Sequence, residues 1–125
     1  MLRIQTIRNG LTTKEIEREM KNAAQMKEFS HANILKILSV LSNVTWRDRS
    51  TSFIQMERCE PDLRGFIDDR RHEGKNISID NYMKILLDIL SGIRFLHNHH
   101  IIHRDIKLDN STYNFSARRL MMSQF

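Results

Sequence analysis

The segment from residue 78 to residue 97 constrains the fold most strongly, because its apolar residues repeat at helical spacing. They fall at steps of four, three, four and three residues, at Tyr82, Leu86, Ile89, Ile93 and Leu96. Met83, Leu87 and Leu90 widen this stripe, and Ser78 and Asp80 are both good N-cap residues. The pattern predicts a long helix that starts near residue 78 or 80 and is buried on several sides.

The N-terminal part of the chain predicts a strand followed by a helix. Residues 2–7 alternate apolar and polar side chains, which favours a half-buried strand. Thr12 and Glu15 have the spacing of a capping box, in which each residue satisfies a free backbone N–H of the other. We therefore expect a helix over about residues 13–28.

Two strands and a short helix are expected in the middle of the chain. Residues 34–41 have the apolar content of a strand, although periodicity alone does not decide between strand and buried helix. Residues 51–56 form a clearer strand candidate after a hairpin-like link at residues 46–50. Pro61 is expected to open a short helix, because its missing N–H costs nothing in the first turn, and Gly74 to close it.

Composition indicates a single globular domain. The chain has 125 residues, 40% hydrophobic and 28% charged, with a single Pro and four Gly. The lone Cys59 cannot form an internal disulfide. No apolar run reaches the roughly 18 to 20 residues of a membrane span, and no signal peptide is visible, so we expect a cytoplasmic protein without a membrane span. The net charge of +5 is spread among acidic residues, and aromatic residues make up only 7%, so we expect no nucleic-acid partner.

The densest cluster of chemistry-bearing residues directly follows the predicted long helix. It has the pattern H-R-D-x-K-x-x-N, made by His103, Arg104, Asp105, Lys107 and Asn110. The pattern resembles the catalytic loop of the eukaryotic protein kinases, which implies phosphoryl transfer, a reaction that depends mainly on positioning and charge. Asp105 can accept or orient the proton of an attacking hydroxyl, Lys107 can offset charge on the transferred phosphate, and the amide oxygen of Asn110 can help to hold Mg²⁺. If Asp105 and Lys107 formed only an ordinary surface ion pair, the other fixed residues of the H-R-D-x-K-x-x-N pattern would remain unexplained.

In this resemblance, Lys107 is typical of the serine/threonine type. The resemblance covers about residues 2–110. It implies an α+β class and a partial kinase-like fold, with the middle strands and regulatory helix of the small lobe plus the first helices and catalytic loop of the large lobe. It also implies ATP and Mg²⁺ as cofactors, a protein substrate, catalytic roles for Asp105 and Lys107, and a metal-ligand role for Asn110.

The run from residue 53 to residue 59 resembles the fifth strand and hinge of the family. The resemblance makes Met56 the gatekeeper residue and turns the backbone of Glu57 and Cys59 toward adenine, with Lys107 also counted among the nucleotide-binding residues. Residues 54–67 are similar to the stress-sensor kinase/endoribonuclease of the endoplasmic reticulum, and equally to many ciliate-type serine/threonine kinases.

The small-lobe part of the chain departs from the family at two charged positions. The turn His31-Ala32-Asn33-Ile34 corresponds to the family's H-P-N-I, with Ala in place of Pro. The family's glycine-rich loop lies upstream of the residues present. Alignment of residues 2–7 with the third strand, V-A-V-K-x-I, puts Gln5 at the position of the phosphate-binding Lys. The Glu that pairs with this Lys falls at Asn22 when it is counted from His31, and Glu19, one turn away, is the alternative.

The residues after Asn110 show neither D-F-G nor A-P-E. We therefore expect a partial protein kinase domain at residues 1–110 and a divergent, disordered tail at residues 111–125. The first interpretation is a truncated serine/threonine kinase domain that is inactive as this chain alone. The alternative is a pseudokinase-like binding or scaffold module that pairs with a partner kinase. In either case, loss of covering helices would leave part of the apolar stripe of the long helix exposed.

Overall fold

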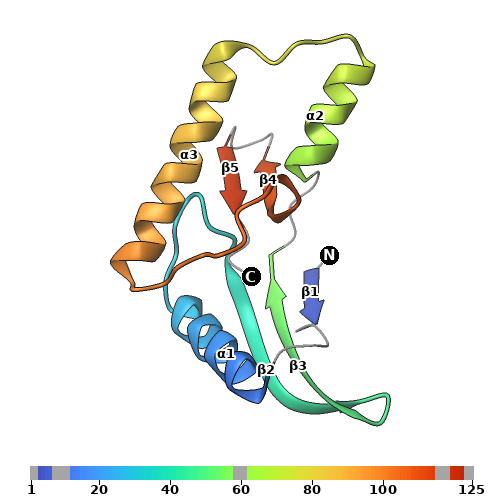
Figure 1. Cartoon of the computed structure of the whole chain (residues 1–125), viewed down its shortest axis with the longest axis vertical. Helices are drawn as coiled ribbons and strands as arrows, with labels where there is room; N and C mark the ends of the chain where they lie inside the picture. Colours follow the sequence, from blue (N-terminus) through green and yellow to red (C-terminus); the bar gives the residue numbers. More distant parts are fainter. Residues whose placement is uncertain (1–2, 7–11, 58–61, 115–118, 123–125) are drawn as a thin grey trace. The chain divides into compact units, whose positions relative to one another are not determined.

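A computed structural model describes residues 3–6, 12–57, 62–114 and 119–122 of the chain (Figure 1). The polypeptide divides into two compact units, one made of residues 1–30 and 36–58 and the other of residues 31–35 and 59–125. The described part contains two antiparallel sheets and three α-helices, which confirms the predicted α+β class.

The first unit is a three-stranded antiparallel sheet with one helix. Its elements are β1 (Arg3–Thr6), α1 (Thr13–Lys27), β2 (Ile37–Trp46) and β3 (Arg49–Met56). The strand order is β1-β3-β2, so β3 is central and β2 lies at an edge. The helix α1 contacts β2 and β3, and this contact forms the core of the unit. The buried apolar residues of these elements are Met20, Ala23, Met26, Ile37, Ile54 and Met56.

The helix α1 starts where the sequence predicted. The Thr12 side chain accepts a hydrogen bond from the backbone N–H of Glu15, and the Glu15 carboxylate accepts one from the backbone N–H of Thr12 at 2.7 Å. The predicted capping box is therefore confirmed. This reciprocal bonding holds the pKa of Glu15 below its usual value, because the Thr12 backbone and then its hydroxyl stabilise the carboxylate.

The β2–β3 hairpin differs from the prediction in its length and in its turn. The strand β2 begins at Ile37 and continues to Trp46, so the link has two residues, Arg47 and Asp48, instead of five. Both have a left-handed backbone, with φ of 49° and 60°. Hairpins prefer such turns because their twist matches that of the strands, but they usually use Asn and Gly there. Because Arg47 and Asp48 stand where such turns usually have Asn and Gly, the sequence did not indicate a two-residue link.

The second unit combines two helices with a small hairpin. Its elements are α2 (Leu63–His72), α3 (Ile79–Asn98), the single turn of 3₁₀ helix η1 (Leu108–Asn110), β4 (Ser111–Asn114) and β5 (Arg119–Met122). The strands β4 and β5 are antiparallel partners, and α3 contacts β5.

The helix α2 begins at a different cap from the one predicted. Pro61 lies outside the described residues. The first helical residue is Leu63, because the Asp62 carboxylate accepts a hydrogen bond from the backbone N–H of Gly65 at 2.7 Å. The expected end at Gly74 is correct: its φ is +66°, and its N–H bonds to the carbonyl of Arg71. Glycine adopts this conformation without a side-chain clash.

The expectation of a disordered segment after Asn110 is wrong for residues 111–114 and 119–122, which form β4 and β5. The strand β5 is tied to the 31–35 segment by backbone hydrogen bonds from Leu35 N to Met122 O and from Met122 N to Asn33 O, both 2.9 Å. The Asn33 side chain also donates to the carbonyl of Leu120. Leu120 and Met122 are fully buried. Contacts with residues distant in sequence therefore order this segment, which is why its local sequence did not reveal it.

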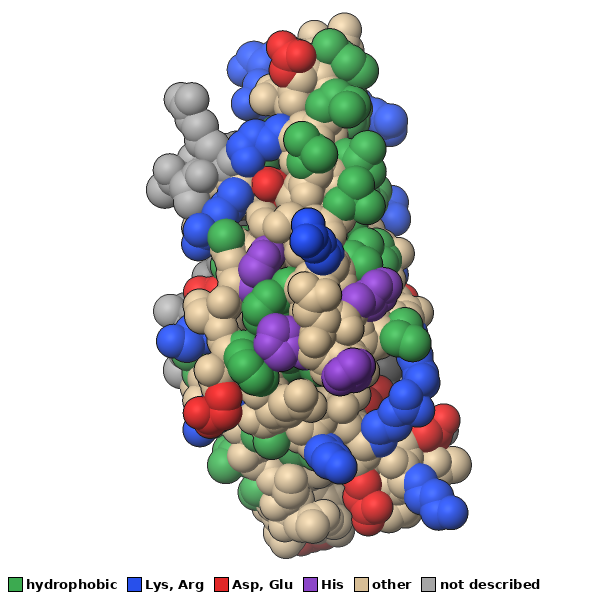
Figure 2. Space-filling model, turned by 90° about the vertical axis from the view of Figure 1, so that its left-hand side faces the viewer, with side chains coloured by type: hydrophobic (Ala, Val, Ile, Leu, Met, Phe, Trp, Pro, Cys, Tyr) green, Lys and Arg blue, Asp and Glu red, His purple; other side chains and the backbone are tan. Residues whose placement is uncertain are grey.

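The helix α3 has the predicted length and cap; it is not buried on several sides, and the expectation that part of its apolar stripe is exposed is the one that the structure confirms. The Ser78 side chain accepts a hydrogen bond from Asn81 N, which confirms the start. Only Ile85, Gly92 and Leu96 are buried, on the side that faces β5. A side chain at Gly92 would collide with Met122 and Ile34. The opposite side forms the exposed α3 face, made of Ile79, Tyr82, Met83, Leu86, Leu87 and Leu90 and visible along the upper part of Figure 2.

We expect the 125-residue chain to self-associate through the exposed α3 face, because a contiguous apolar surface of this extent is poorly solvated. Replacing Leu86 and Leu90 by Lys should lower the apparent mass in light scattering to that of the monomer. The control replaces Ser91 and Arg94 by Lys, outside the apolar residues of the face. A wild-type chain that is already monomeric at micromolar concentration would contradict this prediction.

Candidate active site

The loop that follows α3 is shaped by two left-handed residues. The helix ends at Asn98, and His100 then has a φ of 58°, which reverses the chain toward buried Ile101. Arg104 has a φ of 65°. The ring nitrogen Nδ1 of buried His103 accepts a hydrogen bond from Asp105 N at 3.2 Å, and this bond holds the bend. Left-handed conformations of residues other than glycine are uncommon and concentrate at functional sites.

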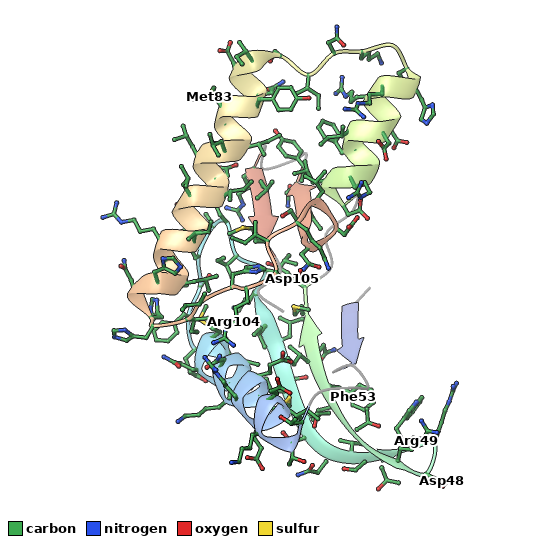
Figure 3. All side chains as sticks on the ribbon, viewed as in Figure 1. Asp48, Arg49, Phe53, Met83, Arg104 and Asp105 are labelled. Atoms are coloured by element: carbon green, nitrogen blue, oxygen red, sulfur yellow. The ribbon has the colours of Figure 1, made fainter. Side chains whose placement is uncertain are left out.

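The structure brings the three predicted catalytic and metal-binding residues into one cluster. Lys107 Nζ lies 3.0 Å from Asp105 Oδ2. The side-chain amide of Asn110 donates to the same oxygen at 2.8 Å and to the backbone carbonyl of Asp105 at 2.9 Å. Asn110 N bonds to the Lys107 carbonyl, which closes η1. Asp105 and Arg104 are labelled in Figure 3, where the loop runs from the lower end of α3 toward β4.

Electrostatics keep the Asp105 carboxylate ionised. Hydrogen bonds from Lys107 and then from Asn110 stabilise the charged form and hold the pKa of Asp105 below its usual value. The carboxylate is therefore negative throughout the neutral range. Because Asn110 turns its N–H₂ toward Asp105, its amide oxygen Oδ1 points elsewhere. An amide oxygen is a suitable ligand for Mg²⁺, which commonly takes one or two protein oxygens and completes its shell with phosphate and water.

The helix α2 supports this loop in a way that the sequence did not indicate. Arg64 Nε lies 2.6 Å from Asp109 Oδ1, next to Asn110. Two residues further along α2, the ring of Phe66 stacks on Tyr113 of β4, with centroids 5.3 Å apart. The two residues of the ion pair are 45 positions apart, and no local pattern connects them. These contacts fix η1 and β4 against the N-terminal half of α2.

Two of the predicted nucleotide-binding residues of the hinge, Met56 and Glu57, belong to the first unit. Met56 ends β3 and is fully buried. Glu57 is half-buried, and its N–H donates to the carbonyl of Lys36, while its carboxylate accepts from Lys36 N. Cys59 lies outside the described residues.

The candidate positions for the Lys–Glu pair also belong to the first unit. Gln5 lies in β1, paired in register with Ile54 of β3. Asn22 and Glu19 are half-buried on α1. Burial, and then the nearby Glu15 charge, raise the pKa of Glu19. No cation among the described residues forms an ion pair with Glu19, so nothing there offsets the effect of burial and of Glu15 on the charged form of its carboxylate.

The turn at residues 31–34 organises the start of the second unit. The His31 ring accepts a hydrogen bond from Asn33 N at 3.1 Å and stacks on Phe95 of α3, with centroids 4.6 Å apart. Burial, and then the charge of Arg119, lower the pKa of His31. The neutral ring is the form that can accept this bond. Histidine side chains gather on this face of the molecule in Figure 2.

Comparison with known proteins gives a consistent result. A family model described as the protein kinase domain matches residues 3–125. Cyclin-dependent kinase 4 of Xenopus laevis is 30% identical over 110 residues, which cover 87% of this chain and 33% of that protein. Probable cyclin-dependent kinase 8 of Dictyostelium discoideum is 35% identical over 85 residues, or 68% and 22% of the two chains. Probable serine/threonine-protein kinase fhkB of the same organism is 28% identical over 111 residues, or 89% and 9%.

The chain thus spans a third or less of the length of these relatives. The family match runs past residue 110 and includes the segment that the sequence alone had separated as a tail. Among the helices of the described residues, none combines the length and the apolar character that crossing a bilayer requires.

Proposed function

The chain belongs to the protein kinase domain family, and we propose that the loop from His103 to Asn110 is its site for serine/threonine phosphoryl transfer, with ATP and Mg²⁺ as cofactors and a protein hydroxyl as acceptor. The observation that carries this proposal is the cluster in which one Asp105 oxygen is bonded by both Lys107 and Asn110. The name of one relative, the probable serine/threonine-protein kinase fhkB, supports the serine/threonine class.

Each residue of the cluster has one role in the proposal. Asp105, kept ionised by its two partners, orients the acceptor hydroxyl and takes its proton. Lys107 lies within reach of the same oxygen and stabilises negative charge on the phosphate in transfer. Asn110 holds Mg²⁺ through Oδ1, and the metal supplies charge neutralisation at the phosphates. Met56 and the backbone of Glu57 and Cys59 bind the adenine.

Three neutral residues at positions where the family has charged ones indicate that this chemistry is weak in the 125-residue chain. Gln5 is neutral where the family has the phosphate-binding Lys, and Asn22 is neutral where it has the partner Glu. The third neutral residue follows β5. In the family, an apolar strand after the catalytic loop leads to D-F-G. Here the apolar strand β5 is followed closely by Gln124-Phe125. We therefore place Gln124 at the position of the metal-holding Asp. A neutral amide binds Mg²⁺ more weakly than a carboxylate does.

A second candidate function, a pseudokinase-like module that binds a partner kinase, rests on the same neutral residues. These neutral residues stand at the positions that bind phosphate and metal, or support that binding, in the family, whereas the catalytic loop keeps the residues of the family pattern. The similarity of the hinge to the endoplasmic-reticulum stress sensor and the cytoplasmic location remain predictions.

The experiment measures phosphate transfer from Mg-ATP to a generic serine/threonine substrate by the 125-residue chain. We expect no turnover above background. Turnover that disappears in Asp105→Ala would overturn the expected inactivity and support the assignment of Asp105. Nucleotide binding is measured in parallel by thermal shift. Asn110→Ala should abolish the Mg²⁺-dependent part of the ATP-induced shift, whereas Asn98→Ala, at the exposed end of α3, should not change it. Equal effects of the two variants would contradict the role of Asn110.

A further inference from the structure

The outer end of the β2–β3 hairpin carries a surface that the proposed kinase site does not use. We call it the hairpin tip surface and define it as Leu41, Trp46, Arg47, Arg49 and Phe53. In the described residues, β1 pairs with β3 only over residues 53–56, so the hairpin continues beyond its third strand. Figure 1 shows this end curving away from α1, and Figure 3 labels Arg49 and Phe53 along it.

The residues of the hairpin tip surface share one face of the hairpin. Trp46 pairs with Arg49, and Leu41 pairs with Phe53, which places the members of each pair on the same side. The rings of Trp46 and Phe53 meet edge to face, with centroids 6.2 Å apart, and the Arg47 guanidinium lies 6.0 Å from the Trp46 centroid. The opposite face of β3 carries Ile54 and Met56, which are fully buried.

The surface has the composition of a protein interface. Trp46, the single Trp of the chain, is 56% exposed, and Leu41 is 51% exposed. Between Ile37 and Met56 the only charged residues are Arg47, Asp48 and Arg49, although 28% of the whole chain is charged. Protein interfaces are enriched in aromatic residues and Arg and depleted in Lys and Glu, and Trp and Arg dominate their binding energy. The hairpin therefore differs from an ordinary solvated surface.

The turn supports the same conclusion. Arg47 has a φ of 49° and Asp48 a φ of 60°. A left-handed backbone costs a residue such as Arg roughly 1 kcal/mol, whereas Asn and Gly adopt it readily. The turn thus keeps a charged residue over Trp46 at a cost in stability. Strain that is retained in this way is typical of functional positions.

Charge identifies the kind of partner. Among the described residues, neither Arg47 nor Arg49 forms an ion pair with a carboxylate, and with Asp48 the turn has a net positive charge. We propose that the hairpin tip surface docks an acidic protein segment, whose carboxylates pair with the two guanidinium groups and whose aromatic or aliphatic side chain packs on Trp46. Arg binds carboxylates in a bidentate manner, which gives such a contact a defined geometry. This interaction does not depend on ATP or on the catalytic loop.

Trp46 makes the proposal directly measurable, because all tryptophan fluorescence of the chain comes from this position. The probe is a random glutamate–tyrosine copolymer, excited at a wavelength selective for tryptophan. We expect a saturable change in emission that weakens with salt. Arg47→Gln with Arg49→Gln should weaken binding about ten-fold, as expected for the loss of two exposed charge pairs. Arg18→Gln with Arg71→Gln removes the same charge from exposed helix positions and should leave binding unchanged.

A second variant separates binding from folding. Arg47→Asn with Asp48→Gly creates the turn that hairpins prefer and leaves the net charge of the chain unchanged. We expect its thermal midpoint to rise and its affinity for the copolymer to fall. The proposal is overturned if the copolymer does not change Trp46 emission, if this variant keeps full affinity, or if the helix control loses as much as the tip variant. Tighter binding of an oligodeoxythymidylate would also overturn it and assign the surface to nucleic acid.

Discussion

Replacing Leu120 by Ala is expected to lower the free energy of unfolding by about 3 kcal/mol, the range found for buried Leu to Ala changes. Leu120 is fully buried in β5. Its N–H donates to an Asp88 carboxylate oxygen at 2.9 Å, and its carbonyl accepts from the Asn33 side chain. A cavity at this position therefore loosens the contact between β5, α3 and the 31–35 segment. Urea unfolding followed by circular dichroism, at concentrations low enough to avoid association, measures the effect.

The matched control is Leu87→Ala, the same change on the exposed α3 face, where Leu87 is 61% exposed. We expect it to alter stability by less than about 0.5 kcal/mol. Equal effects of the two substitutions would mean that the residues after Asn110 contribute nothing to the folded core, as the sequence alone had suggested.

Restoring charge at the phosphate end of the proposed site is expected to strengthen Mg-ATP binding by about 10-fold to 100-fold. The variant is Gln5→Lys with Asn22→Glu. A charged hydrogen bond contributes roughly 1.5–3 kcal/mol, which corresponds to this range. The new Glu keeps the Lys ionised and in position, so Gln5→Lys alone should gain less. Isothermal titration calorimetry with ATP and Mg²⁺ measures the gain.

The control for this variant is Gln25→Lys with Asn98→Glu, which adds the same charges at exposed helix positions. It should not change affinity. An equal gain in the control, or no gain from the paired restoration, would show that Gln5 does not occupy the position of the phosphate-binding Lys.

The sequence predicted most accurately the features that depend on neighbouring residues. The capping box of Thr12 and Glu15, the Ser78 cap and the end of α2 at Gly74 all use hydrogen bonds or backbone preferences that act within one helical turn. The five residues of the H-R-D-x-K-x-x-N pattern likewise lie close together in the chain. Their short spacing already places Asp105, Lys107 and Asn110 within one loop, and the structure adds the bonds that join them.

Features that depend on distant residues were missed. The two-residue turn at Arg47 and Asp48 contains neither Gly nor Asn, so its left-handed conformation is imposed by the pairing of β2 with β3. The ion pair between Arg64 and Asp109 joins two helical elements that no pattern relates. The periodicity of α3 predicted burial on several sides, which is wrong for one side, because periodicity shows which residues share a face but not whether another element covers that face; the exposure of part of the stripe was expected only from the comparison with the kinase pattern.

The long apolar stripe and the catalytic-loop pattern were determined by the sequence itself, because helix formation and short-range spacing depend on residues a few positions apart. Only the tertiary structure decided that Leu120 and Met122 belong to the core, that α2 holds the loop, and which residues of α3 form its exposed side. Each of these outcomes arises from contacts between residues that are far apart in the chain, whose free energy depends on how the elements pack and not on local sequence.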